Sequence, residues 1–175
     1  MTGQRPDDGG TVIRRATPAD LPAVGRLGAM LLRLHYELDR DRFMRSGPGA
    51  DTGYASFLAT QLDEPDSVVL VAQRDHHIVG YLYAGIEPRS WKELRERAGF
   101  IHDILVDEPS RRLGIAEALL DAGIDWLRRR HVPRVLLWTA ARNEPAQRVF
   151  LRKGFRSTMI EMTLELGDDG EPSST

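Results

Sequence analysis

The sequence predicts an α/β (α+β) fold, in which a mixed sheet carries helices on its faces. Three observations lead to this prediction. Apolar residues form segments in the order strand, two helices, three strands, helix, strand, helix, strand. The length of 175 residues is that of one domain with one hydrophobic core. The hydrophobic fraction of 41% and the charged fraction of 29% are typical of a globular chain.

A strand and two helices are predicted in the first part of the chain. Residues 12–14 form a short β-rich run, and Thr17 followed by Pro18 has the pattern of an N-cap with proline at the first helical position. The next apolar residues recur at three- and four-residue spacing, which places them on one helix face: Leu21, Val24, Leu27, Leu31 and Leu34. After a Gly-Pro break at residues 46–49, a second helix is predicted around Phe57, Leu58 and Leu62.

Three strands are predicted in the middle of the chain. Residues 68–72 and 78–86 are β-rich runs separated by a short polar turn, which predicts an antiparallel hairpin. Residues 101–106 form a third run of the same kind.

Two helices and two strands are predicted in the last part. Helical periodicity extends over residues 114–130, and a buried strand is expected at 135–138. A shorter helix over 143–153 ends at Gly154, and residues 155–166 are predicted to return to the sheet as a final strand. Trp126 and Trp138 are expected to pack in the core.

A single domain is expected over residues 11–167. The segments 1–10 and 168–175 are rich in Gly, Pro, Asp and Ser, so both are predicted to be flexible tails.

Composition and charge exclude several functional classes. The 24 basic and 26 acidic residues give a net charge of -2, which argues against a nucleic-acid partner held by a strongly basic surface. The chain has no cysteine, so disulfides, thiolate metal sites and cysteine nucleophiles are excluded. The longest apolar run is far too short to cross a membrane, and the N-terminus lacks the pattern of a secretory signal. A cytoplasmic protein without membrane or metal partners is expected.

The segment after the third strand of the middle group carries the strongest chemical signal. A buried strand leads through a turn into a helix that begins near Gly114. Backbone N–H groups at a helix N-terminus have no partner within the helix, and the helix dipole adds positive charge there. Gly114 and Ala116 are small, so a phosphate group could approach these donors closely. The pattern predicts an anion cradle that would fit a pyrophosphate.

Two motifs resemble those of the GNAT superfamily of acyl-CoA-dependent N-acyltransferases. The first is a basic residue, two residues, Gly, one residue, and Gly or Ala, which is present here as Arg111, Gly114 and Ala116. The second is an Asn opening a helix, followed by Ala, an aromatic residue and Gly-Phe, present here as Asn143, Ala146, Phe150, Gly154 and Phe155. The resemblance covers about residues 12–166. It implies a mostly antiparallel sheet of about six to seven strands flanked by about four helices.

The resemblance also implies acetyl-CoA as co-substrate and a direct attack by an amine in a ternary complex. It assigns the pyrophosphate to the backbone N–H groups that open the helix, and the pantetheine arm to the end of the preceding strand and to the Asn. The cofactor contacts it implies are Leu105, Val106, Arg111, Arg112, Leu113, Gly114, Ile115, Ala116, Asn143 and Phe150. A backbone N–H at the strand end would act as an oxyanion hole for the thioester carbonyl.

The sequence does not decide which residue acts as the general base. A primary amine must lose a proton before or during attack. Asp103 matches a position that is often acidic in the family, which makes it a candidate base. Glu87 is a further candidate because it lies at the end of the preceding strand. His102 is adjacent to Asp103, but strand alternation sends the two side chains to opposite faces unless a β-bulge intervenes.

One departure from the family pattern affects the leaving group. Phe150 stands where many members have a tyrosine whose hydroxyl can protonate the thiolate. Water, or the hydroxyl of Tyr81 or Tyr83, would have to replace it. Two functions therefore follow: an N-acetyltransferase acting on a small-molecule or peptide amine, or an acyl-CoA-binding regulatory module with little turnover. A homodimer is a further possibility implied by the family.

Overall fold

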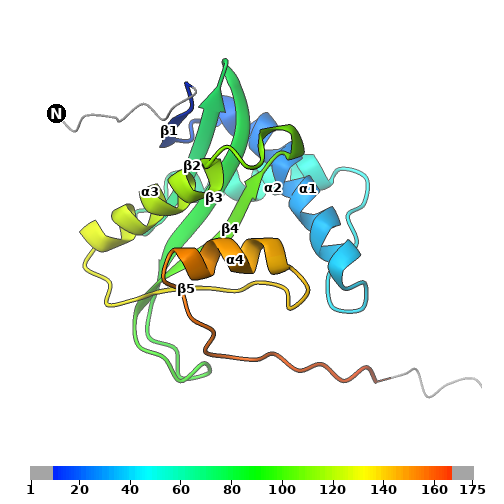
Figure 1. Ribbon diagram of the computed structural model, residues 1–175, viewed down its shortest axis with the longest axis vertical. Helices are drawn as coiled ribbons and strands as arrows, with labels where there is room; N and C mark the ends of the chain where they lie inside the picture. The colour runs from blue at the N-terminus through cyan, green and yellow to red at the C-terminus, as the bar shows by residue number, and fades with distance from the viewer. Residues whose placement is uncertain (1–9, 167–175) are drawn as a thin grey trace, which may run out of the picture.

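The computed structural model describes residues 10–166, which contain one five-stranded sheet (Figure 1). The strands follow the order β1-β2-β3-β4-β5 across it. Their bounds are β1 Val12–Arg15, β2 Ser67–Arg74, β3 His77–Glu87, β4 Ala98–Val106 and β5 Val135–Leu137. The first four are mutually antiparallel, whereas β5 is parallel to β4. The predicted hairpin and the mixed sheet are confirmed.

Two helices cover each face of the sheet (Figure 1). Helices α1 (Leu21–Leu38) and α2 (Ala50–Leu62) pack with the buried side chains of Val69, Val71 and Tyr81. Helices α3 (Ile115–Arg129) and α4 (Glu144–Arg152) enclose the second core, whose members include Leu82 and Ile101. The four predicted helices are confirmed, and the sheet is buried on both faces because each of its sides has its own apolar cluster.

The start of α1 is held by a compact polar arrangement. Thr17 precedes a 3-10 turn, Pro18–Asp20, and α1 continues directly from it. The buried carboxylate of Asp20 accepts two hydrogen bonds from the Arg14 guanidinium, at 2.7 and 2.8 Å, and one from the Thr17 backbone N–H at 2.8 Å. These bonds lower the pKa of Asp20 well below its usual range and fix β1 against the helix that follows.

A β-bulge lies in the middle of β4. Tyr83 is opposite Asp103 and Ala84 is opposite Ile101, so His102 is the additional residue on the β4 side. The parallel pairing with β5 also ends at Ile101, which is opposite Leu137. From His102 onward, β4 therefore continues to Val106 with a strand partner, among the described residues, on the β3 side alone.

The final strand predicted over residues 155–166 is wrong for the chain as the structure describes it. This segment has no strand partner among residues 10–166, and its apolar side chains after Phe155 are exposed. The described part of the sheet accordingly has five strands, fewer than the six to seven expected. A segment forms a strand only where a partner edge lies within its reach.

Two smaller outcomes concern the core and the ends of the chain. Trp126 is buried as predicted, whereas Trp138 is 74% exposed because it lies just beyond the end of β5. Apart from Gly10, the predicted tails lie outside the described residues.

Candidate active site

The divergence of β4 from β5 creates an opening at one edge of the antiparallel sheet. The two strands pair from Gly99 and Val135 to Ile101 and Leu137 and then separate. An opening of this kind leaves backbone N–H and C=O groups on the β5 side of β4 without a strand partner.

The alternation along β4 identifies which amides face this opening. The N–H of Gly99 donates toward the β5 side, to Arg134 O at 2.9 Å, and the N–H of Asp107 donates toward β3, to Val79 O at 2.8 Å. Because backbone direction alternates along a strand, two residues separated by an even number of positions should face the same side. Gly99 and Asp107 are separated by an even number of positions, yet their N–H groups face opposite sides of β4. The additional residue at the bulge, His102, accounts for this reversal. Beyond it, the amides of Ile104 and Val106 face the opening, and that of Leu105 faces β3.

Ile104 was therefore missed by the sequence reasoning, which selected Leu105 and Val106. No local pattern in the sequence predicts the bulge. The side of β4 toward which each backbone N–H points could therefore not be assigned from the residues. Leu105 is buried on the α1 and α2 side, where it belongs to the same cluster as Tyr81 and Tyr83.

A loop with free amides follows the end of β4, which we call the amide loop (residues 111–116). A 3-10 turn, Glu108–Ser110, precedes it and is capped by the Asp107 side chain, which accepts from the Ser110 N–H at 3.1 Å. Arg112 and Gly114 then adopt positive φ angles of 64° and 75°. Within residues 10–166, none of the backbone N–H groups of residues 112–116 donates a hydrogen bond. The loop thus presents a row of unpaired donors at the N-terminus of α3, as predicted.

The two arginines of the amide loop have different surroundings. Arg111 Nε donates to the Val106 carbonyl at 3.3 Å, so this side chain ties the loop to the end of β4. Arg112 is exposed and makes no ion pair within the described residues. Arg112 can therefore turn toward an anion at the loop, whereas Arg111 holds the loop in shape.

Helix α4 follows β5 in the chain and packs on the same face of the sheet as α3. Asn143 is its N-cap, and its Oδ1 accepts from the Ala146 N–H at 3.3 Å. The capping bond uses the side-chain oxygen and leaves the side-chain amide group for a ligand. Phe150 is buried in the α3 and α4 core, with its ring 6.1 Å from that of Phe155. Arg152 pairs with Glu117 of α3 at 2.6 Å and joins the two helices next to the amide loop.

A cluster of hydroxyl and carboxylate groups lies on the opposite face of β4. The Tyr54 hydroxyl of α2 donates to Asp103 Oδ2, and the Tyr81 hydroxyl of β3 donates to the Tyr54 hydroxyl at 3.3 Å. Burial raises the pKa of Asp103, although the Tyr54 hydrogen bond opposes this effect. Gly28 of α1 makes room for this arrangement, because a Cβ there would lie 2.0 Å from Cδ1 of Tyr54. We call Tyr54, Tyr81 and Asp103 the tyrosine cluster.

His102 lies on the same face as Asp103 because of the bulge. Its ring stacks on Tyr83 and Phe100, with centroid distances of 4.7 and 5.1 Å. Its Nε2 is 3.4 Å from Glu87 Oε1, and its side chain is 28% exposed. Burial lowers the pKa of His102, against the opposing effect of Glu87, so the ring is neutral at pH 7. The structure thus brings His102, Asp103 and Glu87 to one side of the opening.

The tyrosine hydroxyls considered as substitutes for the family's tyrosine are both engaged elsewhere. Tyr81 is fully buried, and burial raises its pKa far above the ordinary value. The Tyr83 hydroxyl donates to Gln61 Oε1 at 3.0 Å. Neither is a free proton donor in this arrangement.

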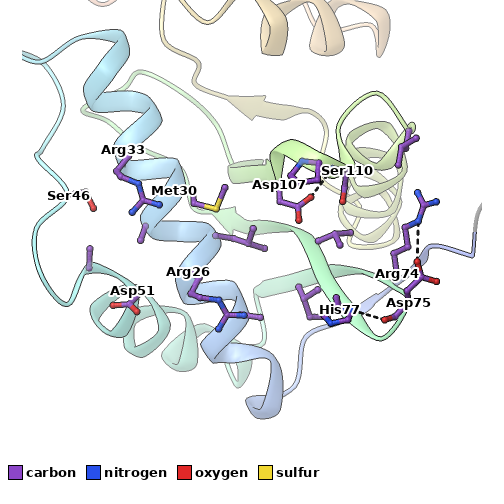
Figure 2. A pocket seen from close by; sticks show the side chains of 18 of the residues that line it. Arg26, Met30, Arg33, Ser46, Asp51, Arg74, Asp75, His77, Asp107 and Ser110 are labelled. Carbon is purple, nitrogen blue, oxygen red and sulfur yellow. Dashed lines mark hydrogen bonds and ion pairs between the residues drawn. The ribbon is translucent and has the colours of Figure 1, made fainter.

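A groove lies beside the opening rather than in it. It has a volume of about 800 Å³ and runs between α1, the β2–β3 turn and the end of β4. Figure 2 shows Arg26, Met30 and Arg33 projecting from α1 across from Asp107 and Ser110. Leu113 is the one predicted site residue that lines it. Its size does not make it the reactive site, because it contains neither the β4 edge nor His102.

Residues 10–166 contain no group of three or more His, Cys, Asp or Glu side chains that could hold a metal ion. No helix in that range is both long and apolar enough to span a membrane.

The sequence model of the family described as "Acetyltransferase (GNAT) family" matches residues 32–155. This chain belongs to that family. The match begins in α1 and ends after α4, so it includes the opening, the amide loop and the capping Asn143. The GNAT resemblance predicted from the two motifs is confirmed.

Individual relatives agree with this assignment. The mycothiol acetyltransferase of Acidothermus cellulolyticus is 28% identical over 120 residues, which are 64% of this chain and 36% of that protein. The chain thus spans about a third of the length of the mycothiol acetyltransferases it matches.

Two solved structures extend the comparison. A mutant of the BH1408 protein from Bacillus halodurans has a TM-score of 0.77 at 26% identity, covering 89% of this chain and 99% of that one. An aminoglycoside N-acetyltransferase, AAC(6')-Iy in complex with CoA, has a TM-score of 0.69 at 17% identity, covering 95% and 97%. This second likeness shows the fold alone.

Proposed function

We propose that the domain over residues 11–167 is an N-acetyltransferase that transfers the acetyl group of acetyl-CoA to a primary amine of a small molecule or peptide. The observation that carries the proposal is the combination of a strand edge with free amides and a helix N-terminus with free amides, joined by a single turn. A pantetheine arm and a pyrophosphate need these two kinds of donor in that order.

The residues present fit this co-substrate. The amides of residues 112–116 suit the pyrophosphate, and Arg112 adds a charge that is not paired in the described residues. The backbone N–H of Val106 can donate to an amide carbonyl of the pantetheine arm. The side-chain NH2 group of Asn143, at the start of α4, can donate to the same arm. The Ile104 amide lies nearer the start of the opening, where it suits the thioester carbonyl oxygen.

The co-substrate supplies an acetyl thioester. The amine nitrogen forms a bond to the carbonyl carbon, the carbon–sulfur bond breaks, and the sulfur leaves as a thiolate. The Ile104 amide stabilises the negative charge that develops on the carbonyl oxygen, because its N–H is held in place by β4 before the reaction begins. Much of the rate then comes from holding the amine and the thioester at the same opening.

His102 is the group we propose to accept the proton of the attacking amine. Its Nε2 faces Glu87, so the tautomer that carries the proton on Nε2 leaves Nδ1 as the acceptor. Its lowered pKa keeps it neutral at pH 7. Glu87 then acts through His102, as a positioning residue that also stabilises the imidazolium.

Asp103 is the alternative base, directly or through water. Its Oδ2 accepts the Tyr54 hydroxyl hydrogen bond, so this oxygen is engaged within the tyrosine cluster. We therefore propose a structural role for Asp103 and assign the thiolate proton to water, since Phe150 has no hydroxyl.

The acceptor amine is expected to approach from the α1 and α2 side of β4, where His102, Glu87 and the exposed ring of Trp138 are gathered. The Trp138 ring meets the edge of Phe100 at 5.2 Å, and this places an aromatic surface beside His102. Aromatic and carboxylate groups together favour a cationic amine. The relatives named after mycothiol and aminoglycosides guide the choice of amines for the assay.

A turnover assay tests the proposal. The protein is incubated with acetyl-CoA and a panel of aminoglycosides, amino sugars, polyamines and peptides with free N-termini, and the free thiol released is measured. We expect thiol release that depends on both enzyme and amine, with a product heavier by one acetyl group.

A second function, an acyl-CoA-binding regulatory module, is motivated by Phe150. It predicts cofactor binding without acetylated product for every amine of the panel. A single acetylated amine eliminates this second function, and the absence of cofactor binding eliminates both.

A further inference from the structure

One arginine in the loop between β3 and β4 is largely shielded from solvent. The loop consists of residues 88–97, and all of them apart from Ser90 and Arg95 are exposed. These two residues pair through their backbones, because each N–H donates to the carbonyl of the other, at 2.9 and 3.1 Å. The Arg95 side chain is 13% exposed. An arginine is seldom shielded to this degree unless its charge is paired, so its partners indicate what it does.

Each nitrogen of the Arg95 guanidinium has a different partner. Nη1 donates to the Pro88 carbonyl at 2.8 Å, and Nε donates to Glu93 Oε2. Both partners belong to the loop, so these two contacts hold the side chain in one orientation. The remaining nitrogen, Nη2, lies 3.7 Å from Glu87 Oε2 at the end of β3. This third contact links the loop to a residue of the candidate active site.

The Glu87 carboxylate lies between Arg95 and His102. Its Oε2 faces the Arg95 guanidinium, and its Oε1 is 3.4 Å from His102 Nε2. The Glu87 side chain is half-exposed, and such a side chain samples several rotamers when a single partner holds it. A separate partner for each oxygen fixes the plane of the carboxylate. Arg95 therefore restricts the orientation in which Glu87 meets His102.

The ring of Phe100 connects the same groups a second time. The Arg95 guanidinium carbon lies 5.8 Å from the centroid of this ring, and the His102 ring stacks on it at 5.1 Å. The His102 ring also stacks on Tyr83. Stacking fixes the plane of an imidazole but does not select which of its nitrogens carries the proton. That selection depends on the hydrogen-bond partner of each nitrogen.

Glu87 is the acid that can make this selection. Its charge is the one that acts on the His102 pKa, in opposition to burial. The other acids of this region are engaged elsewhere, since Asp103 accepts from Tyr54 and Glu93 accepts from Arg95. The orientation of Glu87 consequently determines the tautomer of His102.

We propose that Arg95 is a positioning residue for the acetyl transfer, because it holds the Glu87 carboxylate so that His102 keeps its proton on Nε2 and presents Nδ1 to the attacking amine. The inference rests on the proposed function, in which His102 accepts the proton of the amine. Arg95 itself touches neither the amine nor the thioester. Its effect on the reaction passes through Glu87.

The tautomer of His102 tests the inference without any turnover. NMR of the imidazole nitrogens, at a pH above the His102 pKa, distinguishes the nitrogen that carries the proton from the one that does not. In the unmodified protein we expect one tautomer, with the proton on Nε2. In Arg95→Met the freed Glu87 carboxylate should allow both tautomers, so the chemical shifts of the two nitrogens should move toward each other. Unchanged shifts in this variant would overturn the proposal.

Arg89→Met is the matched control. It removes a positive charge from the same loop, but Arg89 is exposed and pairs with Glu96 at 3.4 Å, so the His102 tautomer should stay as in the unmodified protein. Arg95→Lys keeps a positive charge beside Glu87 and should preserve the Nε2 tautomer better than Arg95→Met does. The loop should fold in both Arg95 variants, because its pairing with Ser90 uses backbone atoms. Circular dichroism checks this.

A double-mutant cycle on kcat/KM separates positioning through Glu87 from general support of the loop. Arg95→Met should lower kcat/KM by about tenfold and leave CoA affinity unchanged, as expected for Glu87→Gln. If Arg95 acts through Glu87, the double variant should also lose about tenfold. A loss of about hundredfold, the product of the two single effects, would mean that Arg95 acts independently of Glu87, and this overturns the proposal.

The two measurements keep this inference separate from the proposed function. If the protein acetylates no amine, the NMR measurement still decides whether Arg95 orients Glu87 and His102. If acetylation occurs and Arg95→Met changes neither the tautomer nor kcat/KM, the proposed function stands and the positioning role of Arg95 is wrong.

Discussion

The amide loop and the tyrosine cluster lie near opposite faces of β4 and differ in whether their polar groups have hydrogen-bond partners within the chain. The amide loop keeps the N–H groups of residues 112–116 unpaired and partly exposed. The tyrosine cluster uses its groups internally, in the chain from Tyr81 to Tyr54 to Asp103. Unpaired donors favour an external anion, whereas internally paired groups fix a shape. On our proposal, the amide loop is a binding surface and the tyrosine cluster supports the strand that borders the proposed site.

The largest expected effect comes from closing the amide loop with Gly114→Glu. The φ of 75° at this position disfavours any side chain, and a carboxylate there would repel a pyrophosphate. Loss of two or more charge-assisted hydrogen bonds predicts CoA affinity lower by about 10³-fold, about 4 kcal/mol. Calorimetric titration measures it. Gly53→Glu on α2 is the matched control, since a Cβ there meets nothing within 4 Å, and its CoA affinity should match that of the unmodified protein.

The next effect concerns proton removal by His102. His102→Gln should lower kcat/KM by about 10²-fold or more and leave CoA affinity unchanged. In the unmodified protein, kcat/KM should fall as the pH drops through the His102 pKa, which burial lowers from its ordinary value, because a protonated ring cannot accept a proton. Glu87→Gln should have a smaller effect, of about tenfold, and should move this acid limb to lower pH. If Asp103→Asn abolishes turnover and His102→Gln does not, the base is Asp103.

The tyrosine cluster should affect stability more than binding. Tyr54→Phe removes the hydroxyl that donates to the half-buried Asp103, so the free energy of unfolding should fall by about 1–3 kcal/mol. Tyr36→Phe on α1 is a matched control, because its hydroxyl makes no hydrogen bond within the described residues. Urea denaturation measures both variants. Equal stability of the two would remove the support role assigned to Tyr54.

The smallest effect is the pH dependence contributed by Asp103. Its pKa is raised in the folded state, so the folded protein binds this proton more tightly than the unfolded chain does. The contribution of Asp103 to stability is therefore present below the unfolded pKa and is lost as the pH rises through the folded pKa. Asp103→Asn should gain stability relative to the unmodified protein over that window. A difference that stays constant with pH would show that Asp103 titrates as in the unfolded chain.

The amide loop could be predicted from sequence because its chemistry is local. Gly114, Ala116 and the strand before them are contiguous, and a helix N-terminus presents free amides whatever surrounds it. Asn143 is a similar case, since a cap acts on its own helix. Most helices and strands were predictable for the same reason, because their apolar periodicity is a short-range property.

The tyrosine cluster could not be predicted, because it joins residues distant in the chain. Tyr54 and Asp103 are 49 positions apart, and no motif connects them. The bulge at His102 was likewise invisible, yet it moves His102 to the face of Asp103 and turns the amide of Ile104 toward the opening. The prediction of a strand over residues 155–166 was wrong for a related reason, because the residues of a segment do not determine which sheet edge it can join.

An amide-resolved NMR titration with acetyl-CoA shows which backbone N–H groups bind the co-substrate. We expect the largest chemical-shift changes at the amides of Ile104, Val106 and residues 112–116, with a smaller change at Leu105. Along the groove that contains Arg26 and Arg33 we expect little change. Saturable binding with shifts confined to that groove, or no binding at millimolar acetyl-CoA, would show that the β4 edge and the amide loop do not hold the co-substrate.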